Sequence, residues 1–233
     1  MFHSFKKKFN STLLTFLLMV TLGLTGCSTM TEIRASDALV NAAARTLNTL
    51  KSRADLDQFN AELQKAAGVA IFPSVYKAGF FIGAEGGNGL LIAKDTNGHW
   101  GYPAFYTLAS GSWGFQMGGQ KSGIIFIIRN PGAVAALIKH QGNVSAGVGV
   151  AVGSIGAGLK GAITTNLGAD IIAYSESKGL YGGFSLGGSA LVRRNDLNSE
   201  YYGGQVEPKA ILLQHAHQNP QADVLRHNLR EQR

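Results

Sequence analysis

Apolar residues between positions 36 and 67 recur every three or four residues, which is the spacing of one face of an α-helix. The first such run places its apolar residues on a single face: Leu39, Ala42, Ala43, Leu47 and Leu50. It predicts a helix over residues 36–51, with Ser36 as its N-cap. A second helix is predicted over residues 54–67, with Gly68 as its C-terminal cap. Both apolar stripes are expected to pack on the domain rather than lie on a membrane.

From residue 69 onward the apolar residues form short runs that are typical of β-strands. The first run, GVAIFP, is expected to end at Pro73, and the next two, AGFFIGAE and GLLIAKD, are separated by GGN. The dipeptide Asn97-Gly98 between two strand-like runs predicts a hairpin. The continuously apolar run GIIFII is typical of a strand that is buried on both faces.

Four further glycine-rich runs follow a short predicted helix that begins near Pro131. They lie close together along the chain, which favours an antiparallel sheet. The chain holds 31 glycines in 233 residues, nearly twice the usual share of about 7%. Because glycine inside a strand suits a bend or a close backbone approach, the sheet is expected to be tightly curved or closed into a barrel.

The C-terminal part of the chain returns to a helical pattern. Pro208 suits the first position of a helix over PKAILLQHAH, and Pro220 separates this helix from a last, polar one. The predicted fold class is therefore α+β, an antiparallel, glycine-rich curved β-sheet or closed barrel packed with N-terminal and C-terminal helices. The sequence shows no repeat unit and no independent second domain.

The first 26 residues have the organisation of a secretion signal. A basic start that contains KKK is followed by an apolar run over residues 13–24, which is too short to cross a bilayer as a helix of about 20 residues. The next residues, Leu24-Thr25-Gly26-Cys27, resemble the lipobox of bacterial lipoproteins. We therefore expect a lipoprotein signal peptide over 1–26, a tether over 27–35 and one domain with a helical C-terminal tail over 36–233.

Cys27 is the only cysteine of the chain, and it ends this motif. In a lipoprotein the signal is removed before that cysteine, whose thiol and new amino terminus are then acylated. Two or three acyl chains hold a protein firmly at a bilayer, since each buried methylene contributes about 0.8 kcal/mol. Ser28, and not an aspartate, follows Cys27, which favours an outer-membrane lipoprotein that faces the periplasm or the cell exterior. The alternative is an ordinary signal peptide beside an unmodified thiol.

Two glycine motifs match enzyme signatures in spacing but lack the surrounding elements. Residues 156–161 fit GxGxxG, yet a strand-like sequence follows them, whereas a dinucleotide site needs a helix there. The run GFSLG fits GxSxG around Ser185, and Asp196 with His215 or His217 would complete a catalytic triad. A nucleophile elbow requires a strand that enters a helix, whereas Ser185 lies within an alternating strand. A serine hydrolase is thus the less favoured alternative, and no enzymatic activity is expected.

The charged residues favour neither a metal site nor nucleic-acid binding. The two histidines of the HAH run point in different directions on a helix, and no cysteine or carboxylate nearby completes a metal site. The net charge of +7 includes three lysines of the signal, and the remaining basic residues are scattered without the stripe that nucleic acid requires. Only Arg193 and Arg194 are adjacent, and two neighbouring guanidinium groups either bind a phosphate head group or protect a strand end. No cofactor is expected.

Several blocks, in the same order along the chain, closely resemble the SYLF domain. They are GVAIFPSVYKAGFFIGAEGGNGLLIAK, GSWGFQMGGQ, IIRNPGAVAAL, AYSESKGLYGGFSLGGSALVRRN and YYGG. Gly187 stands where the family has an acidic residue. The region over 36–51, which is basic in eukaryotic relatives, carries only Arg45 and Lys51 here.

The resemblance implies a lipid-binding module and not an enzyme. With the predicted anchor, it indicates an envelope lipoprotein whose domain binds lipid or another amphiphile, with anionic membrane lipids as candidate partners. The candidate head-group contacts are Lys77, which belongs to the KAGF block, and the pair Arg193 and Arg194. The alternative is an envelope scaffold that binds another protein through its sheet or its helical tail.

Overall fold

The computed structural model describes residues 33–53, 57–79, 82–113, 118–139, 150–152, 170–176 and 189–231. Apart from Ile33, these residues belong to one compact unit, Arg34–Arg233. Its strands are β1 (Gly68–Gly79), β2 (Ile82–Ala93), β3 (Ala104–Trp113), β4 (Gly118–Ile128), β5 (Val150–Val152), β6 (Ile171–Ser175) and β7 (Ser189–Arg193). Its helices are α2 (Ala35–Lys51), α3 (Asp57–Lys65), α4 (Pro131–Lys139), α5 (Asn195–Tyr202), α6 (Pro208–Leu212) and α7 (Asp223–Arg230), with a 3-10 turn η2 (Pro220–Ala222).

The strands form one sheet in the order β5-β6-β4-β1-β2-β3-β7. All neighbouring strands are antiparallel except β5 and β6, which pair in parallel. The predicted α+β class with a mainly antiparallel sheet is confirmed. The closed barrel is wrong for the described strands, because β5 and β7 lie at opposite edges of the sheet and do not pair with each other.

Alternate residues of the central strands enter two separate apolar cores. In β1, Val69 and Ile71 belong to one core, whereas Ala70 and Phe72 belong to the other. The same alternation runs through β4 over residues 124–128, so the GIIFII run is buried on both faces as predicted. A strand with two apolar faces needs cover on both sides to stay out of water.

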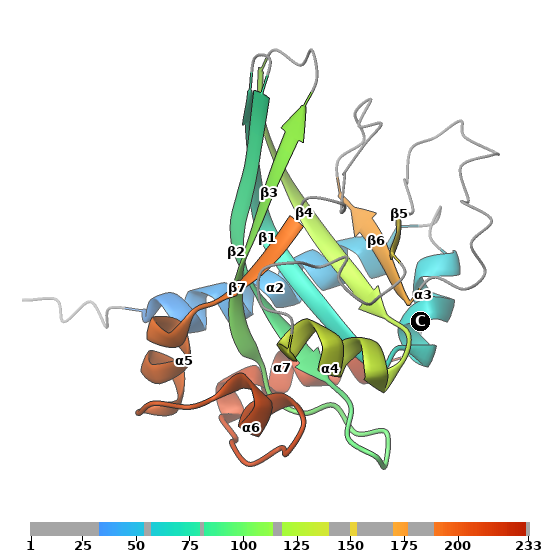
Figure 1. Cartoon of the computed structure of the whole chain (residues 1–233). Coiled ribbons are helices and arrows are strands. Elements are labelled where there is room, and N and C mark those ends of the chain that lie inside the picture. Colours follow the sequence, from blue (N-terminus) through green and yellow to red (C-terminus); the bar gives the residue numbers. More distant parts are fainter. Residues whose placement is uncertain are drawn as a thin grey trace, which may run out of the picture. The chain divides into compact units, whose positions relative to one another are not determined.

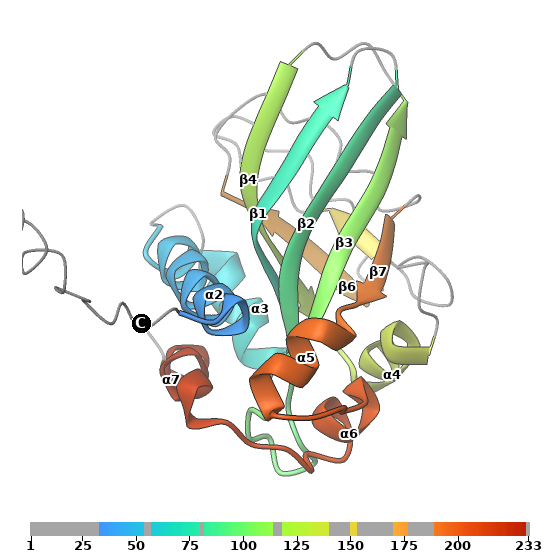
Figure 2. The same ribbon diagram turned by 90° about the vertical axis from the view of Figure 1, so that its left-hand side faces the viewer.

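Helices supply this cover on each face. The first core receives α2, α3, α5 and α7, through Val40, Leu47, Phe59, Leu63, Tyr201, Leu225 and Leu229. The second core receives α4 and α6, through Val134, Leu137, Ile211 and Leu212. Figure 1 shows α4 in front of the sheet and α2 behind it, and the turned view of Figure 2 separates α2, α3 and α7 from α4 and α6.

The strand β1 continues through Pro73, where the sequence predicted its end. The register of β1 shifts at this point against both β2 and β4, which is the signature of a bulge. A bulge accepts proline because the ladder there does not need its missing N–H group. The GGN run does not divide two strands either, since β2 passes through it. A Cβ on Gly87 of β2 would lie 2.2 Å from the Ser74 carbonyl oxygen, so the bulge in β1 requires glycine at this position of β2.

The predicted helices are present, with changes at their ends. The helix α2 confirms the expected 36–51 run, but Arg34 and not Ser36 is its N-cap residue. The helix α3 ends at Lys65, and Gly68 begins β1 instead of capping the helix. Pro208 opens a helix as predicted, although α6 is only five residues long.

The Asn97-Gly98 hairpin between β2 and β3 is confirmed. The Gly98 amide donates to the carbonyl of Asp95 at 3.0 Å, and Gly98 has a φ of 82°, a conformation that glycine adopts without strain. The helix α5 was not predicted, and its C-terminus explains the YYGG block. Gly203 is left-handed, with a φ of 77°, and its amide donates to the carbonyl of Ser199.

Replacing Gly89 with alanine is expected to destabilise the domain by about 2 kcal/mol, the usual size for overpacking. Its Cβ would lie 2.3 Å from the Phe72 ring and 2.4 Å from the Ile71 carbonyl oxygen. Chemical denaturation measures the loss. The control is Gly204→Ala, whose Cβ would meet nothing within 4 Å. Equal stabilities of the two variants would contradict the close packing of β1 on β2.

Candidate functional site

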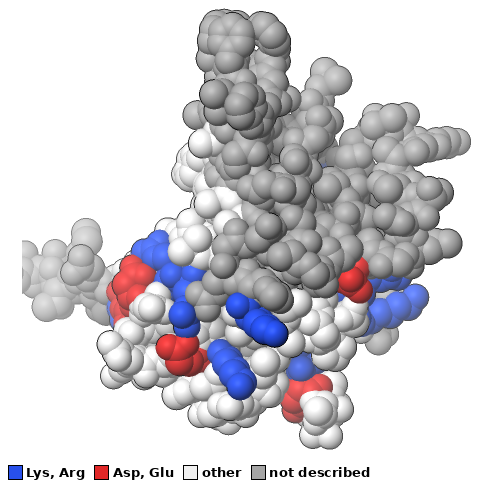
Figure 3. Space-filling model, in the orientation of Figure 1, with Lys and Arg blue, Asp and Glu red and all other residues white. Residues whose placement is uncertain are grey.

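A surface groove of about 370 Å³ lies between α4, α6 and the end of β7. Its lining combines charged and apolar side chains: Ala135, Ile138, Lys139, Arg193, Glu207, Pro208, Lys209 and Leu213. Figure 3 shows basic side chains close together on the face of the molecule that carries α4 and α6. Three cations and one carboxylate give the groove a formal charge of about +2 at neutral pH.

Arg193 enters the groove because of its position in β7. Leu191, two residues earlier, belongs to the core under α4 and α6, and side chains two positions apart in a strand share a face. Arg193 lies opposite Tyr106 in the β3–β7 register, and Tyr106 belongs to the same core. The guanidinium of Arg193 forms an ion pair with the carboxylate of Glu207, which precedes α6.

Tyr106, opposite Arg193 in the strand register, has a buried hydroxyl. Its side chain is only 1% exposed, and the hydroxyl has no hydrogen-bond partner among the described residues. Burial raises the pKa of Tyr106 well above its ordinary value, and the charges of Arg193 and Glu207 both act on it. The hydroxyl is therefore neutral at physiological pH.

Arg194 does not join Arg193 in a common phosphate clamp. It binds Asp196 through two nitrogens, at 2.8 and 2.6 Å, and the side-chain oxygen of Asn88 at 2.6 Å. Asn88 lies on the β2 face that carries Leu90, which is the face covered by α2. The two adjacent arginines thus serve opposite faces of the sheet.

Lys77 lies far from both arginines along the sheet. Its backbone pairs with Glu85 of β2 and Gln120 of β4. The register continues from Glu85 through Ser110 of β3 to Ser189 of β7, which lies four residues before Arg193. At ordinary strand spacings, Lys77 and Arg193 are therefore about 20 Å apart. The three predicted head-group residues therefore do not form one site. Cys27 and Ser185, the predicted lipidation site and alternative nucleophile, lie outside the described residues.

Sequence reasoning missed Lys139 and Lys209, which complete the groove. Lys139 is the last residue of α4, where a cation interacts favourably with the helix carboxyl end. Lys209 follows Pro208 in α6. The two lysines are 70 positions apart and belong to unremarkable helical runs, so only the packing of α4 and α6 on one sheet face reveals them as neighbours.

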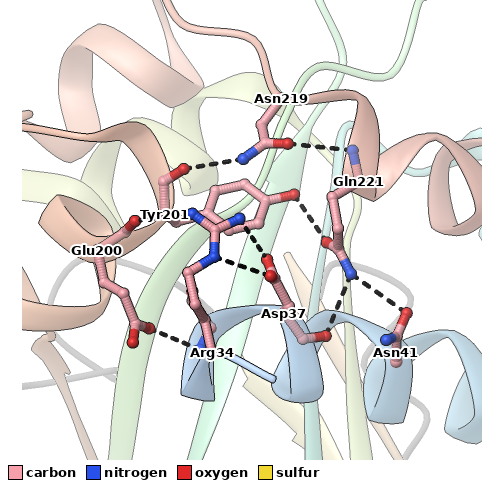
Figure 4. Close-up of polar contacts among 8 residues, drawn as sticks. Arg34, Asp37, Asn41, Glu200, Tyr201, Asn219 and Gln221 are labelled. Carbon is pink, nitrogen blue, oxygen red and sulfur yellow. Dashed lines mark hydrogen bonds and ion pairs between the residues drawn. The ribbon is translucent and has the colours of Figure 1, made fainter. Parts of the chain in front are cut away.

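A second polar cluster fastens the start of α2 to the end of the chain (Figure 4). Arg34 binds both carboxylate oxygens of Asp37, at 2.9 and 3.0 Å, and donates to the backbone carbonyl of Glu200 at 3.2 Å. The Glu200 carboxylate accepts the Ser36 amide at 2.8 Å, so a residue of α5 provides the cap that Ser36 was expected to supply. Gln221 donates to the Asp37 carbonyl and to Asn41, both at 3.2 Å.

Neither a membrane span nor a metal site occurs in the part of the chain that the structure describes. Its helices are too short or too polar to cross a bilayer. Its histidines and carboxylates do not gather in groups of three or more that could hold a metal ion.

The geometry defines a helix-covered sheet domain with a charged surface groove between α4, α6 and β7, and comparison with known proteins gives its family. The family model described as Ysc84, Las17-binding protein actin regulator, matches residues 109–232, which is more than half of the chain. The chain therefore belongs to the Ysc84/SYLF family. That description names binding and regulation and no catalysis.

Curated relatives support this assignment. The chain is 35% identical over 165 residues to the SH3 domain-containing YSC84-like protein 1 of Rattus norvegicus, covering 70% of this chain and 48% of the relative. It is 37% identical over 143 residues to the Xenopus laevis protein of the same name, covering 60% and 42%. It is 32% identical over 167 residues to the LAS seventeen-binding protein 3 of Saccharomyces cerevisiae, covering 70% and 36%. The chain spans half or less of the length of these relatives.

The Arg194–Asp196 pair predicts a specific loss of stability in acid. The hydrogen bonds from Arg194 lower the pKa of Asp196 to about 2, from 3.8. Since the folded pKa lies below the unfolded one, the stabilisation is complete above pH 4 and is lost as the pH falls towards 2. Melting temperatures should therefore fall more steeply between pH 4 and pH 2 in the wild type than in Asp196→Asn. Parallel curves would show that the pair does not act in solution.

Proposed function

We propose that this chain is a membrane-associated protein whose Ysc84/SYLF domain binds anionic lipid in the α4–α6–β7 groove, without catalysis. The observation that carries the proposal is the position of Lys139, Arg193 and Lys209 around an apolar floor. An amphiphile presents a charged head group directly beside apolar chains, and the groove presents matching groups to both. The resemblance of the sequence blocks to a lipid-binding module supports the same assignment.

The exposure of the lining residues suits contact with a bilayer surface. Lys139 and Lys209 are exposed, and Leu213 beside them is 40% exposed despite its apolar side chain. Lysines near an anionic bilayer surface contribute about 1 kcal/mol each, and their methylene stems can remain in apolar contact while the ammonium meets the head groups. An exposed leucine next to two such lysines extends the apolar part of the contact.

The double variant Lys139→Ala, Lys209→Ala is expected to bind anionic vesicles about 30-fold more weakly, which corresponds to two lysine contributions. The assay is co-sedimentation of a chain that begins at Ser28, which lacks Cys27 and contains the whole compact unit. The vesicles are phosphatidylcholine with phosphatidylglycerol, and binding should weaken as salt screens the charges.

The matched control is Arg45→Ala, Lys65→Ala, which removes two exposed cations from α2 and α3. This control should bind nearly as well as the wild type. An equal loss in both double variants would show that overall charge, and not the groove, determines binding. A wild-type chain that ignores anionic vesicles would overturn the proposed function.

We further propose that acylated Cys27 tethers the domain to the outer membrane of a bacterial envelope, on the basis of the lipobox-like sequence. Mass spectrometry of the protein from a bacterial membrane fraction should find Cys27 as the first residue, carrying acyl chains. The variant Cys27→Ser should lack them and leave the membrane fraction. A mature protein that begins at another residue would contradict the tether.

A protein-interaction role is the second candidate, and the family description favours it because it names a protein partner, Las17. The C-terminal helices are not a free tail for this purpose, since Leu225 and Leu229 of α7 are buried against the first core. Fluorophosphonate labelling tests the remaining alternative, a hydrolase that uses Ser185, and no labelling is expected.

A further inference from the structure

We propose that Glu207 occupies the place of the ligand's phosphate in the resting groove, and that the groove selects phospholipids with a phosphomonoester head group. This inference rests on the proposed function and names the lipid class that the same groove takes. It assigns to Glu207 a role in specificity, as an internal anion that the head group displaces from Arg193.

The contacts of Glu207 suit a group that is easily displaced. Its side chain is 71% exposed. Among the described residues, its carboxylate forms an ion pair with Arg193 and with no other side chain. Glu207 is the N-cap residue of α6, but its carboxylate makes no capping hydrogen bond. Exposed ion pairs contribute little to stability, so turning this carboxylate away costs the fold little.

Arg193 is fixed by the sheet and partly buried, whereas the side chain of Glu207 is mostly exposed. The backbone of Arg193 pairs with Tyr106 in the sheet, and only 29% of its side chain is exposed. A guanidinium offers a planar set of donors that matches two oxygens of a carboxylate or of a phosphate. The carboxylate now bound there shows that an oxyanion fits this position. Tyr106, the residue opposite Arg193 in the sheet, has a buried hydroxyl with no hydrogen-bond partner among the described residues.

The charges of the groove favour a dianionic head group. Lys139, Arg193 and Lys209 against Glu207 leave a formal charge of about +2, and Glu207 stays at the rim when it turns away. A phosphomonoester carries about −1.5 to −2 at pH 7, which neutralises this charge. A phosphodiester head group such as that of phosphatidylglycerol carries a single negative charge and leaves the groove positive.

The test compares wild type, Glu207→Gln, Arg193→Lys and the control Glu231→Gln, each beginning at Ser28. Glu231 is an exposed glutamate at the end of α7, away from the groove lining. Binding is measured to phosphatidylcholine vesicles with one part in ten phosphatidic acid, and to vesicles with phosphatidylglycerol at equal surface charge. Soluble glycerol 3-phosphate is added as a competitor in a third series. Thermal melting confirms that each variant is folded.

The wild type is expected to prefer phosphatidic acid over phosphatidylglycerol at equal charge. Glu207→Gln should raise the affinity for phosphatidic acid roughly fivefold, the scale of one removed surface charge interaction, whereas Glu231→Gln should not. Arg193→Lys should reduce the preference while it retains binding to both lipids, because lysine keeps the charge but loses the planar donors.

Equal binding of both lipids, with Glu207→Gln no different from Glu231→Gln, would overturn this inference and leave the proposed function standing. Absence of binding to either vesicle by every variant would overturn both. Complete displacement by millimolar glycerol 3-phosphate would identify a free phosphomonoester as the ligand, and would overturn docking on the lipid.

Discussion

The burial of β1 and β4 on both faces is the constraint on which the rest of the domain depends. A strand that reads as continuously apolar cannot face water on either side, so two helical layers are needed where an amphipathic strand would need one. The chain provides one layer from its beginning and its end, α2, α3, α5 and α7, and the other from the connections α4 and α6. Each layer determines what its own face of the sheet can present to a ligand.

In the layer behind the sheet, the first described helix, α2, is bonded to the last one, α7. Lys51, at the end of α2, is buried and donates to the carbonyl oxygens of Asn228 and Glu231 at the end of α7. Asn198 of α5 is also buried, and its amide group accepts from the Phe105 N–H at 2.9 Å, next to the point where β7 leaves β3. Buried polar groups of this kind are stable only with their partners, so α2 depends on α7, and α5 depends on β3.

The layer in front of the sheet creates the groove. Because α4 and α6 come from parts of the chain about 70 residues apart and pack on one sheet face, the end of β7 is left between them. The groove therefore needs no special loop, and its charges come from the ends of ordinary elements. This origin explains why its lysines carry no motif.

The sequence predicted the fold class, most helices, the central buried strand and the Asn97-Gly98 turn, because these follow from local periodicity and turn chemistry. It misplaced the end of β1 at Pro73, since a bulge depends on the glycines of the neighbouring strand. It joined Arg193 and Arg194 because they are adjacent, although alternation along β7 sends them to opposite faces. It could not anticipate the cap that Glu200 provides for the Ser36 amide, because the two residues lie 164 positions apart. It missed that Lys139 and Lys209 line one groove because they too are distant in the sequence.

The fastening of Arg34, Ser36 and Asp37 to α5 and η2 has a mechanical consequence. A pull on the chain at residue 33 acts first on the contacts that bridge to Glu200 and Gln221, and not on the first turn of α2 alone. Tension is thus shared among several bonds that must break together, and α2 cannot unravel from its free end while they hold. These contacts let the domain resist unfolding under a force applied from its N-terminal side.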